Sequence, residues 1–389
     1  VAISKNVSIY LNSASQATLI PSDLDNNSTD NCDTNLSFSA NKTAFTCADL
    51  GANMVILTAT DDSGNLDTTT AIVTVLDTIS PIALATGTTI FLNGNGNASL
   101  TAAQINNGSS DACDVNPTLS IDKMAFTCAD LGANNVTLTV TDVNGNFNTK
   151  TVAVTVVDAV SPMPVTQNII AYLDGTGQVT VSPNNINNGS TDNCLSALTF
   201  SLDINTFNCT NLGANTVNFT VTDAFGNASS TTATVTILDT ISPVMATQNI
   251  TINLDATGNA SITTTNIDNG TSDNCTNNPT LSLDKTAFTC ADLGGNIVIL
   301  TATDANGNTN TQTATVTIVD VTSPVMATQN TTINLDASGN ASITTSAIDN
   351  GTTDNCTSNP TFSLDKMAFT CADLGSNTVT LTATDASGN

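Results

Sequence analysis

The sequence predicts an all-β protein, a tandem array of small antiparallel β-sandwich domains with one disulfide per domain. Three observations predict it. The heptapeptide FTCADLG at 45–51 returns at 126–132, 288–294 and 369–375, with the variant FNCTNLG at 207–213. Repetition at a fixed period is typical of domain arrays. Every repeat also holds two cysteines, and polar and apolar residues alternate through much of each repeat, as they do in half-buried strands.

The repeat period is strict and sets the predicted domain boundaries. Prolines that lie 81 residues apart mark it without any insertion: Pro81, Pro162, Pro243 and Pro324. A unit of this length lies at the small end of the usual range for domains. The predicted domains are residues 1–81, 82–162, 163–243, 244–324 and 325–389. The fifth lacks its last strand, so we expect a fragment of a longer array, whose natural chain continues past residue 389 or is completed by a strand of another molecule.

Six strands are predicted in each repeat, and residues 244–324 show them in order. Apolar and polar residues alternate, without any helical period, over 250–254, 260–262, 281–283, 288–290, 298–302 and 314–318. The turn DANGN at 304–308 is a strong hairpin signal. Threonine dominates the outward positions, where its branched side chain favours a strand and stays hydrated. Short strands with this patterning predict a sandwich of immunoglobulin-like type.

The path of the chain through each domain raises a further expectation. Six antiparallel strands would return the chain to the end of the domain where it started, whereas a linear array needs opposite ends. We therefore expect a seventh short strand, or a crossing between sheets, in the polar stretch before the first cysteine of each repeat. The junction Asp77-Thr-Ile-Ser-Pro81 is too short and stiff for a flexible tether, which predicts a linear array with fixed angles.

The cysteines predict one disulfide within each repeat. The two cysteines of a repeat are always 15 residues apart: Cys32/Cys47, Cys113/Cys128, Cys194/Cys209, Cys275/Cys290 and Cys356/Cys371. A zinc site would need four soft ligands close together, which no repeat supplies. A disulfide that closes a loop of this length contributes about 3 kcal/mol in the chain-entropy model. Disulfides place the chain outside a reducing cytosol, so we expect an extracellular location.

Composition excludes several functions. The 33 acidic residues are all Asp and the six basic residues are all Lys, so the net charge of −27 should repel nucleic acid and anionic lipid. Histidine is absent, which removes the usual base of a Ser or Cys nucleophile. No run of 18 apolar residues occurs. We therefore predict that the fragment is not an enzyme, has no nucleic-acid partner and does not insert into a membrane.

Three recurring Asp positions form the one sharp chemical hypothesis, a calcium site. They end the last strand (Asp77, Asp158, Asp239, Asp320), precede the first cysteine by two residues (Asp111, Asp192, Asp273, Asp354) and open the DxxGN turn (Asp142, Asp223, Asp304, Asp385). If the chain enters each domain at one end and leaves it at the other, Asp77 lies near Asp111 and Asp142 of the next repeat. Calcium prefers such oxygen ligands. The alternative is that these residues only make Asx turns and caps.

The succession DNC, PTLSLDKTAFTCADLG, VILTATDANGN and TATVTIVD resembles the hyalin-repeat (HYR) type of immunoglobulin-like domain. Repeats of this type occur in very large surface proteins of Bacteroidetes, including SprB-like gliding adhesins. The resemblance covers the whole fragment. It implies secretion, display at the cell surface and a role in gliding motility or surface attachment.

Two functions remain open. The first is a structural stalk segment of a long extracellular filament or repetitive adhesin, each repeat a rigid spacer. The alternative is a multivalent module that binds a glycan, such as surface polysaccharide, or other copies of the same filament. Trp is absent, and the only tyrosines, Tyr10 and Tyr172, occupy equivalent positions that later repeats fill with Asn253 and Asn334. This argues against a lectin site in every repeat.

Overall fold

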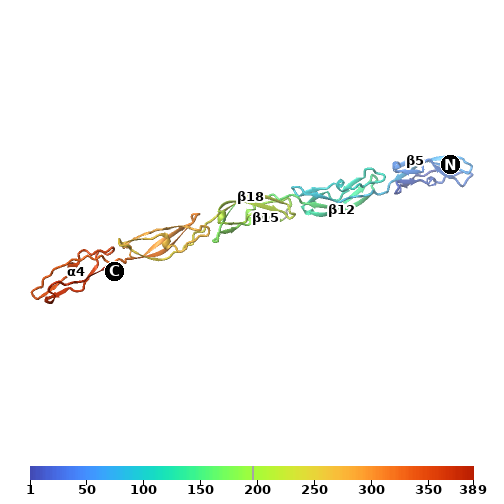
Figure 1. Ribbon diagram of the computed structural model, residues 1–389. Helices are drawn as coiled ribbons and strands as arrows, with labels where there is room; N and C mark the ends of the chain where they lie inside the picture. The colour runs from blue at the N-terminus through green and yellow to red at the C-terminus, as the bar shows by residue number, and fades with distance from the viewer. Residues whose placement is uncertain (195–196) are drawn as a thin grey trace. The chain divides into compact units, whose positions relative to one another are not determined.

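The computed structural model describes residues 1–194 and 197–389, and these form an all-β protein (Figure 1). By its contacts the chain forms two compact parts. One comprises residues 1–166, 187–201 and 219–231, and the other comprises residues 167–186, 202–218 and 232–389. No helix among the described residues is long and apolar enough to cross a membrane.

The strands recur at the sequence period. Repeat 1 contains β1 (Val7–Tyr10), β2 (Gln16–Thr18), η1 (Pro21–Leu24), β3 (Ser37–Ala40), β4 (Ala44–Thr46), η2 (Cys47–Asp49), β5 (Gly51–Thr60) and β6 (Leu66–Leu76). Repeat 2 contains β7 (Thr88–Phe91), β8 (Asn97–Ser99), α1 (Ala102–Ile105), β9 (Thr118–Ile121), β10 (Ala125–Thr127), η3 (Cys128–Asp130), β11 (Gly132–Thr141) and β12 (Phe147–Val157).

The later repeats follow the same order. Repeat 3 contains β13 (Ile169–Tyr172), β14 (Gln178–Thr180), α2 (Pro183–Ile186), β15 (Thr199–Leu202), β16 (Thr206–Asn208), η4 (Cys209–Asn211), β17 (Gly213–Thr222) and β18 (Ala228–Leu238). Repeat 4 contains β19 (Ile250–Asn253), β20 (Asn259–Ser261), α3 (Thr264–Ile267), β21 (Thr280–Leu283), β22 (Ala287–Thr289), η5 (Cys290–Asp292), β23 (Gly294–Thr303) and β24 (Thr309–Val319). Repeat 5 contains β25 (Asn340–Ser342), α4 (Thr345–Ile348), β26 (Thr361–Leu364), β27 (Ala368–Thr370), η6 (Cys371–Asp373) and β28 (Leu381–Thr384).

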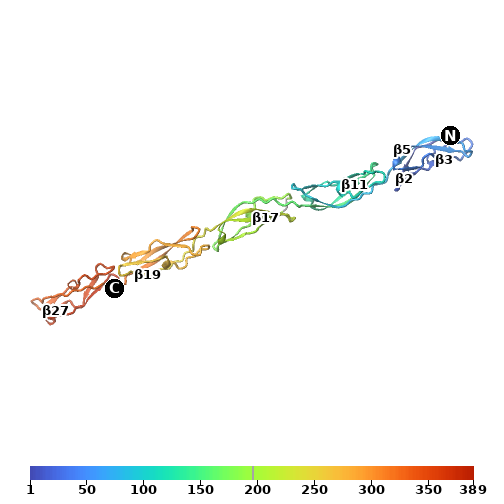
Figure 2. The same ribbon diagram turned by 45° about the horizontal axis from the view of Figure 1, so that its top comes forward.

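Each sandwich consists of a larger and a smaller sheet, as repeat 2 shows. The larger sheet has the order β7-β12-β11-β9, and the smaller sheet pairs β8 with β10. Repeats 1 and 4 have the same arrangement. In repeat 3, β13 pairs with β18 and β14 pairs with β16. Figure 2 labels β5, β11 and β17, the equivalent ten-residue strands of the first three repeats. The predicted immunoglobulin-like sandwich is thus confirmed.

One pair of strands is parallel, contrary to the all-antiparallel prediction. The first strand of a repeat pairs in parallel with the last, so that Ile90 of β7 lies opposite Val156 of β12. A repeat whose first and last strands run the same way is entered at one end and left at the other. The opposite ends that an array requires therefore follow from this pairing.

The polar stretch between β8 and β9 contains no seventh strand, so that alternative is wrong. It carries the chain from the smaller sheet to the larger one, which confirms the expected crossing. The crossing begins with the one-turn helix α1, and two isolated bridges, Ile82 with Ser110 and Ala85 with Asn106, hold it against the start of the repeat. The sequence did not predict such helices.

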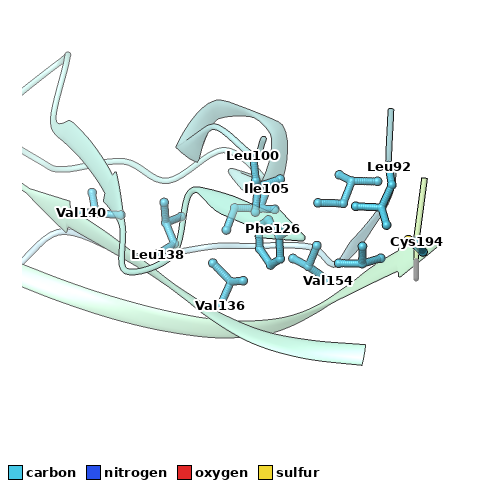
Figure 3. Packing of buried hydrophobic residues seen from close by; sticks show 11 residues of the cluster. Leu92, Leu100, Ile105, Phe126, Val136, Leu138, Val140, Val154 and Cys194 are labelled. Carbon is cyan, nitrogen blue, oxygen red and sulfur yellow. The ribbon is translucent and has the colours of Figure 1, made fainter. Parts of the chain in front are cut away.

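The core of each repeat lies between its two sheets, as Figure 3 shows for repeat 2. Phe126 of the heptapeptide is 1% exposed and lies among Leu100, Ile105 and Val136. Ile105 comes from α1, in a stretch that otherwise reads as polar, and is fully buried. Cys194, which belongs to the next repeat, lies beside Leu92 at one end of this core.

The rest of the heptapeptide ends β10 and starts β11. Asp130 Oδ2 accepts a hydrogen bond of 2.8 Å from the backbone N–H of Thr127, which caps η3. Asp130 also pairs with Lys123, whose Nζ lies 4.9 Å from the ring centroid of Phe126. Gly132 follows with a φ of 95°, a conformation that favours glycine. The Lys–Asp pair recurs in four repeats, and the third has Ile204 and Asn211 instead.

The fifth repeat shows what the last strand contributes. Its residues end at Asn389, before an equivalent of β24, and its segments 330–335 and 375–380 form no strand. Their counterparts in repeat 4 are strand β19 and the start of β23. Leu335 and Val379 are only half-buried. Without the neighbouring strand, these segments therefore have neither a ladder of hydrogen bonds nor a closed core.

Candidate metal centre at the repeat junctions

The three recurring Asp positions each have a local structural role. In the DxxGN turn of repeat 3, Asp223 Oδ1 accepts hydrogen bonds from the backbone N–H groups of Phe225 and Asn227, at 2.8 and 2.9 Å. Its Oδ2 accepts one from Asn227 Nδ2 at 2.8 Å. Asp192 Oδ2 accepts a bond from the N–H of Cys194 at 3.1 Å, and Asp158 Oδ1 accepts one from the N–H of Val160 at 3.1 Å. All three Asp positions therefore make Asx turns, as that interpretation expected.

The structure also brings the three positions together at each junction, as the sequence predicted. One oxygen from each of three Asp side chains lies within 4.8 Å of the other two. These junction triads are Asp77, Asp111 and Asp142; Asp158, Asp192 and Asp223; Asp239, Asp273 and Asp304; and Asp320, Asp354 and Asp385. In each triad the strand-end Asp belongs to one repeat and the other two belong to the next. A fifth cluster, Asp30, Asp33 and Asp61, is more exposed and draws on the first repeat alone.

The junction triads contain buried oxygen atoms that accept no hydrogen bond from the protein. At the second junction these are Asp158 Oδ2 and Asp192 Oδ1. The third and fourth junctions have equivalent atoms on Asp239, Asp273, Asp320 and Asp354. Asp158 is only 4% exposed. Burying a carboxylate oxygen without a donor is costly, so these atoms are the strongest sign that the triads do more than shape turns.

The electrostatics of the second junction reflect this crowding. Burial raises the pKa of Asp192, and the negative charges of Asp158 and Asp223 raise it further. Burial also opposes ionisation of Asp223, but the hydrogen bonds from Asn227 and Phe225 outweigh it and lower the pKa of that carboxyl. Three carboxylates this close repel one another unless a proton or a cation lies among them.

An asparagine between the acidic residue and the cysteine links the two repeats. Asn193 Nδ2 donates hydrogen bonds to Asp158 Oδ1 at 3.1 Å and to the carbonyl of Asn93 at 3.2 Å, both in the preceding repeat. Its Oδ1 is buried and accepts no hydrogen bond. Asn274 and Asn355 repeat this arrangement. Sequence reasoning missed these residues, although the recurring DNC tripeptide carried the signal.

The turn asparagine adds a second link across the junction. Asn227 Nδ2 donates to the backbone carbonyl of Asp158 at 3.2 Å. Equivalent bonds to the strand-end Asp are made by Asn146, Asn308 and Asn389. The DxxGN turn of one repeat is thereby held against the last strand of the repeat before it.

The predicted pairing of cysteines within each repeat is wrong. The disulfides join the second cysteine of one repeat to the first cysteine of the next: Cys47–Cys113, Cys128–Cys194, Cys209–Cys275 and Cys290–Cys356. Cys32 and Cys371, the first and last cysteines of the sequence, are free and exposed.

The physical reason is the path of the chain. The first cysteine follows the crossing at the end where the repeat begins, and it packs on the core of the preceding repeat, as Cys194 does. The second cysteine follows β10 and lies against the β7–β8 turn, where a Cβ on Gly96 would come within 2.8 Å of Cys128 Sγ. A loop of 66 residues closed in this way contributes about 4 kcal/mol in the chain-entropy model.

Comparison with known proteins gives no family. No family model matches the sequence, and no curated protein matches it. Solved structures that align include Sidekick-1 immunoglobulin domains 1–4, with 11% identity and a TM-score of 0.25 over 73% of this chain and 90% of that one. The Drosophila N-cadherin EC1–4 structure has 13% identity and a TM-score of 0.26, over 81% of this chain and 98% of that one. The human Desmocollin-1 ectodomain has 14% identity and a TM-score of 0.24, over 86% of this chain and 83% of that one. Likeness at this level carries no inference about function.

Proposed function

We propose that this chain is a stalk segment of a long extracellular filament or repetitive cell-surface adhesin, in which each repeat is a stiff spacer. One observation carries the proposal: consecutive repeats are joined by a disulfide, and side-chain hydrogen bonds across the same junction reinforce it. A chain built only to display independent binding domains has no need for covalent bonds between them. Uptake of calcium at the junction triads belongs to the same proposal.

The disulfides support an extracellular location, because such bonds persist in oxidising compartments. The resemblance to hyalin-repeat domains of gliding adhesins supports display at a cell surface. A role in gliding motility or surface attachment depends on that resemblance alone. No catalytic role is proposed, since the chain lacks histidine and its acidic triads recur at every junction instead of forming one site.

The disulfide pattern suits a load-bearing chain. Tension applied at the two ends passes from Cys47 directly to Cys113, so residues 48–112 are shielded from it. These residues include β5, β6, β7 and β8. Between one disulfide and the next, only the segment from Cys113 to Cys128 carries the load. Most of the sequence therefore cannot extend while the disulfides are intact.

Small-angle scattering with and without reductant tests the spacer role. We expect the oxidised 389-residue chain to have one fixed maximum dimension at all salt concentrations. Reduction should broaden the distribution of distances, because only hydrogen bonds and packing would then hold each junction. Randomly oriented domains in the oxidised chain would contradict the proposal.

The alternative, multivalent binding of a glycan or of other copies of the chain, is favoured by one observation. Tyr10, Phe91 and Tyr172 occupy equivalent positions in the first three repeats and are 59%, 62% and 56% exposed. Exposed aromatic rings provide flat surfaces on which sugars and other ligands stack. A glycan array probed with the whole chain tests this function. Binding that is lost on Tyr172→Ala would favour it, and the absence of any binding would leave the stalk as the sole proposal.

A further inference from the structure

Resting on the junction role proposed above, we infer that the second, third and fourth junctions each bind one calcium ion through two carboxylate oxygens and one asparagine amide oxygen. At the second junction these groups are Asp158 Oδ2, Asp192 Oδ1 and Asn193 Oδ1. All three are buried and accept no hydrogen bond from the protein. The third carboxylate of the triad, Asp223, supplies further negative charge.

The charge at the junction points to a cation. Each triad brings three carboxylates within 4.8 Å, and its strand-end Asp is only 3–6% exposed. All four salt bridges in the described part of the chain join a Lys to the Asp of a heptapeptide, so none reaches a junction triad. An unpaired buried charge is unfavourable, and neighbouring like charges add to that cost. A divalent cation offsets both costs.

Hydrogen bonds hold the junction asparagine in one orientation. Both hydrogens of Asn193 Nδ2 are committed, one to Asp158 Oδ1 and one to the carbonyl of Asn93. These bonds fix the plane of the amide and hence the direction of Oδ1. An amide oxygen that is buried without a donor is unfavourable in an apo junction, whereas it is an ordinary ligand for calcium.

The donor set selects calcium among common ions. The unpartnered atoms at these junctions are carboxylate and amide oxygens, whereas zinc prefers nitrogen and sulfur ligands. Magnesium demands a near-ideal octahedron and keeps much of its water. Calcium accepts six to eight oxygens in irregular geometry, as a site assembled from two repeats provides.

The first junction differs by one residue and serves as an internal comparison. Ala112 stands where the other junctions have asparagine, and Asp111 Oδ1 is the one orphaned oxygen found there among buried atoms. We expect this junction to bind calcium about tenfold more weakly, in the range by which the loss of one supporting group weakens metal sites. The half-buried cluster of Asp30, Asp33 and Asp61 lacks a strand-end Asp and should bind calcium more weakly still.

Calorimetric titration of calcium into the oxidised, EDTA-treated chain tests the inference. We expect three equivalent sites with a Kd of about 10⁻⁵–10⁻⁴ M, between those of calcium sensors and extracellular modules. Asn193→Ala should reduce the number of these calcium sites to two. Ala112→Asn should raise the number to four, and a gain of binding cannot result from misfolding. The matched control Asn31→Ala, at the equivalent position of the first repeat, should leave the number at three.

Several outcomes would overturn the inference. These are the absence of saturable calcium binding, binding equally tight for magnesium, and an unchanged number of sites in Ala112→Asn. Scattering of the same samples with EDTA separates this inference from the stalk proposal. A chain that keeps its fixed dimension without binding calcium is a stalk held by disulfides alone.

Discussion

The DNC tripeptide performs three tasks with three consecutive residues. Asp192 enters the junction triad, Asn193 bonds to the preceding repeat, and Cys194 closes the disulfide. The sequence predicted the acidic triads because strand-end and turn positions meet wherever sandwiches follow one another. It could not predict the disulfide pairing. Because the repeat is strict, the two cysteines within a repeat are always 15 residues apart, and the second cysteine of one repeat is always 66 residues from the first cysteine of the next. Both pairings are therefore equally regular in the sequence, and only the path of the chain decides between them.

Alkylation of the unfolded chain without reductant tests the pairing at residue level. We expect two labels, on Cys32 and Cys371, because these two cysteines are free and the other eight are bonded. Peptide mapping under non-reducing conditions should recover the Cys128 and Cys194 peptides linked to each other. A chain without any free thiol, or a linked Cys113 and Cys128 pair, would contradict the structure.

Acid should weaken the heptapeptide caps. The hydrogen bond from Lys123, followed by that from the Thr127 N–H, holds the pKa of Asp130 below its ordinary value. A carboxyl whose pKa is lowered by folding stabilises the folded state above the unfolded pKa of about 3.9, and this stabilisation is lost as the pH falls through the folded value. The melting temperature should therefore fall on acidification below about pH 4. Calorimetry should show a shallower fall for Asp130→Asn, and an identical pH profile would refute the assignment.

At the scale of elements, alternation predicted all six strands of repeat 4 and the residues they bury. The parallel pairing of β19 with β24 was missed, because alternation reports which face is buried and not the direction of a neighbour. The one-turn helices were missed as well. A single turn such as α3 buries one side chain, Ile267, and so leaves no helical period to detect.

Ile267→Ala tests whether that turn belongs to the core. Its side chain is fully buried. Truncation should lower the free energy of unfolding by about 2–5 kcal/mol, the usual range for large-to-small core changes. Ile297 of β23 is 71% exposed and provides the control, with an expected change well below 1 kcal/mol for Ile297→Ala. Denaturant unfolding of both variants gives the comparison, and equal effects would exclude a core role for α3.

The fifth repeat tests the contribution of the last strand. Appending a copy of residues 309–320 after Asn389 should order segments 330–335 and 375–380. It adds three inward apolar side chains, of which the copies of Val316 and Ile318 are each worth about 1.5–3 kcal/mol on burial, and it pairs the exposed backbone. Hydrogen exchange at Val379 should slow in the extended chain. Unchanged exchange would mean that the fifth repeat gains nothing from the strand. An appended copy with Asp in place of its three inward apolar residues is the control.

For the whole molecule, the disulfides convert a succession of small domains into a chain of consecutive covalent loops, each joined to the next by a short segment such as Cys113–Cys128. Each closes 66 residues, which would extend to about 230 Å if released. A disulfide within a repeat would keep only about 50 Å of extended chain from being released. The pattern therefore determines how far the chain can lengthen under tension, a property on which a stalk depends and a set of independent binding domains does not.

Single-molecule pulling from the two ends of the oxidised chain measures that property directly. If force passes through the junction disulfides, unfolding of repeat 2, 3 or 4 releases only the residues between successive disulfides, at most about 50 Å per event. After reduction, the same events should lengthen to about 280 Å, the extended length of one repeat. Oxidised events of about 230 Å would instead show bonds within repeats and would contradict the covalently joined stalk.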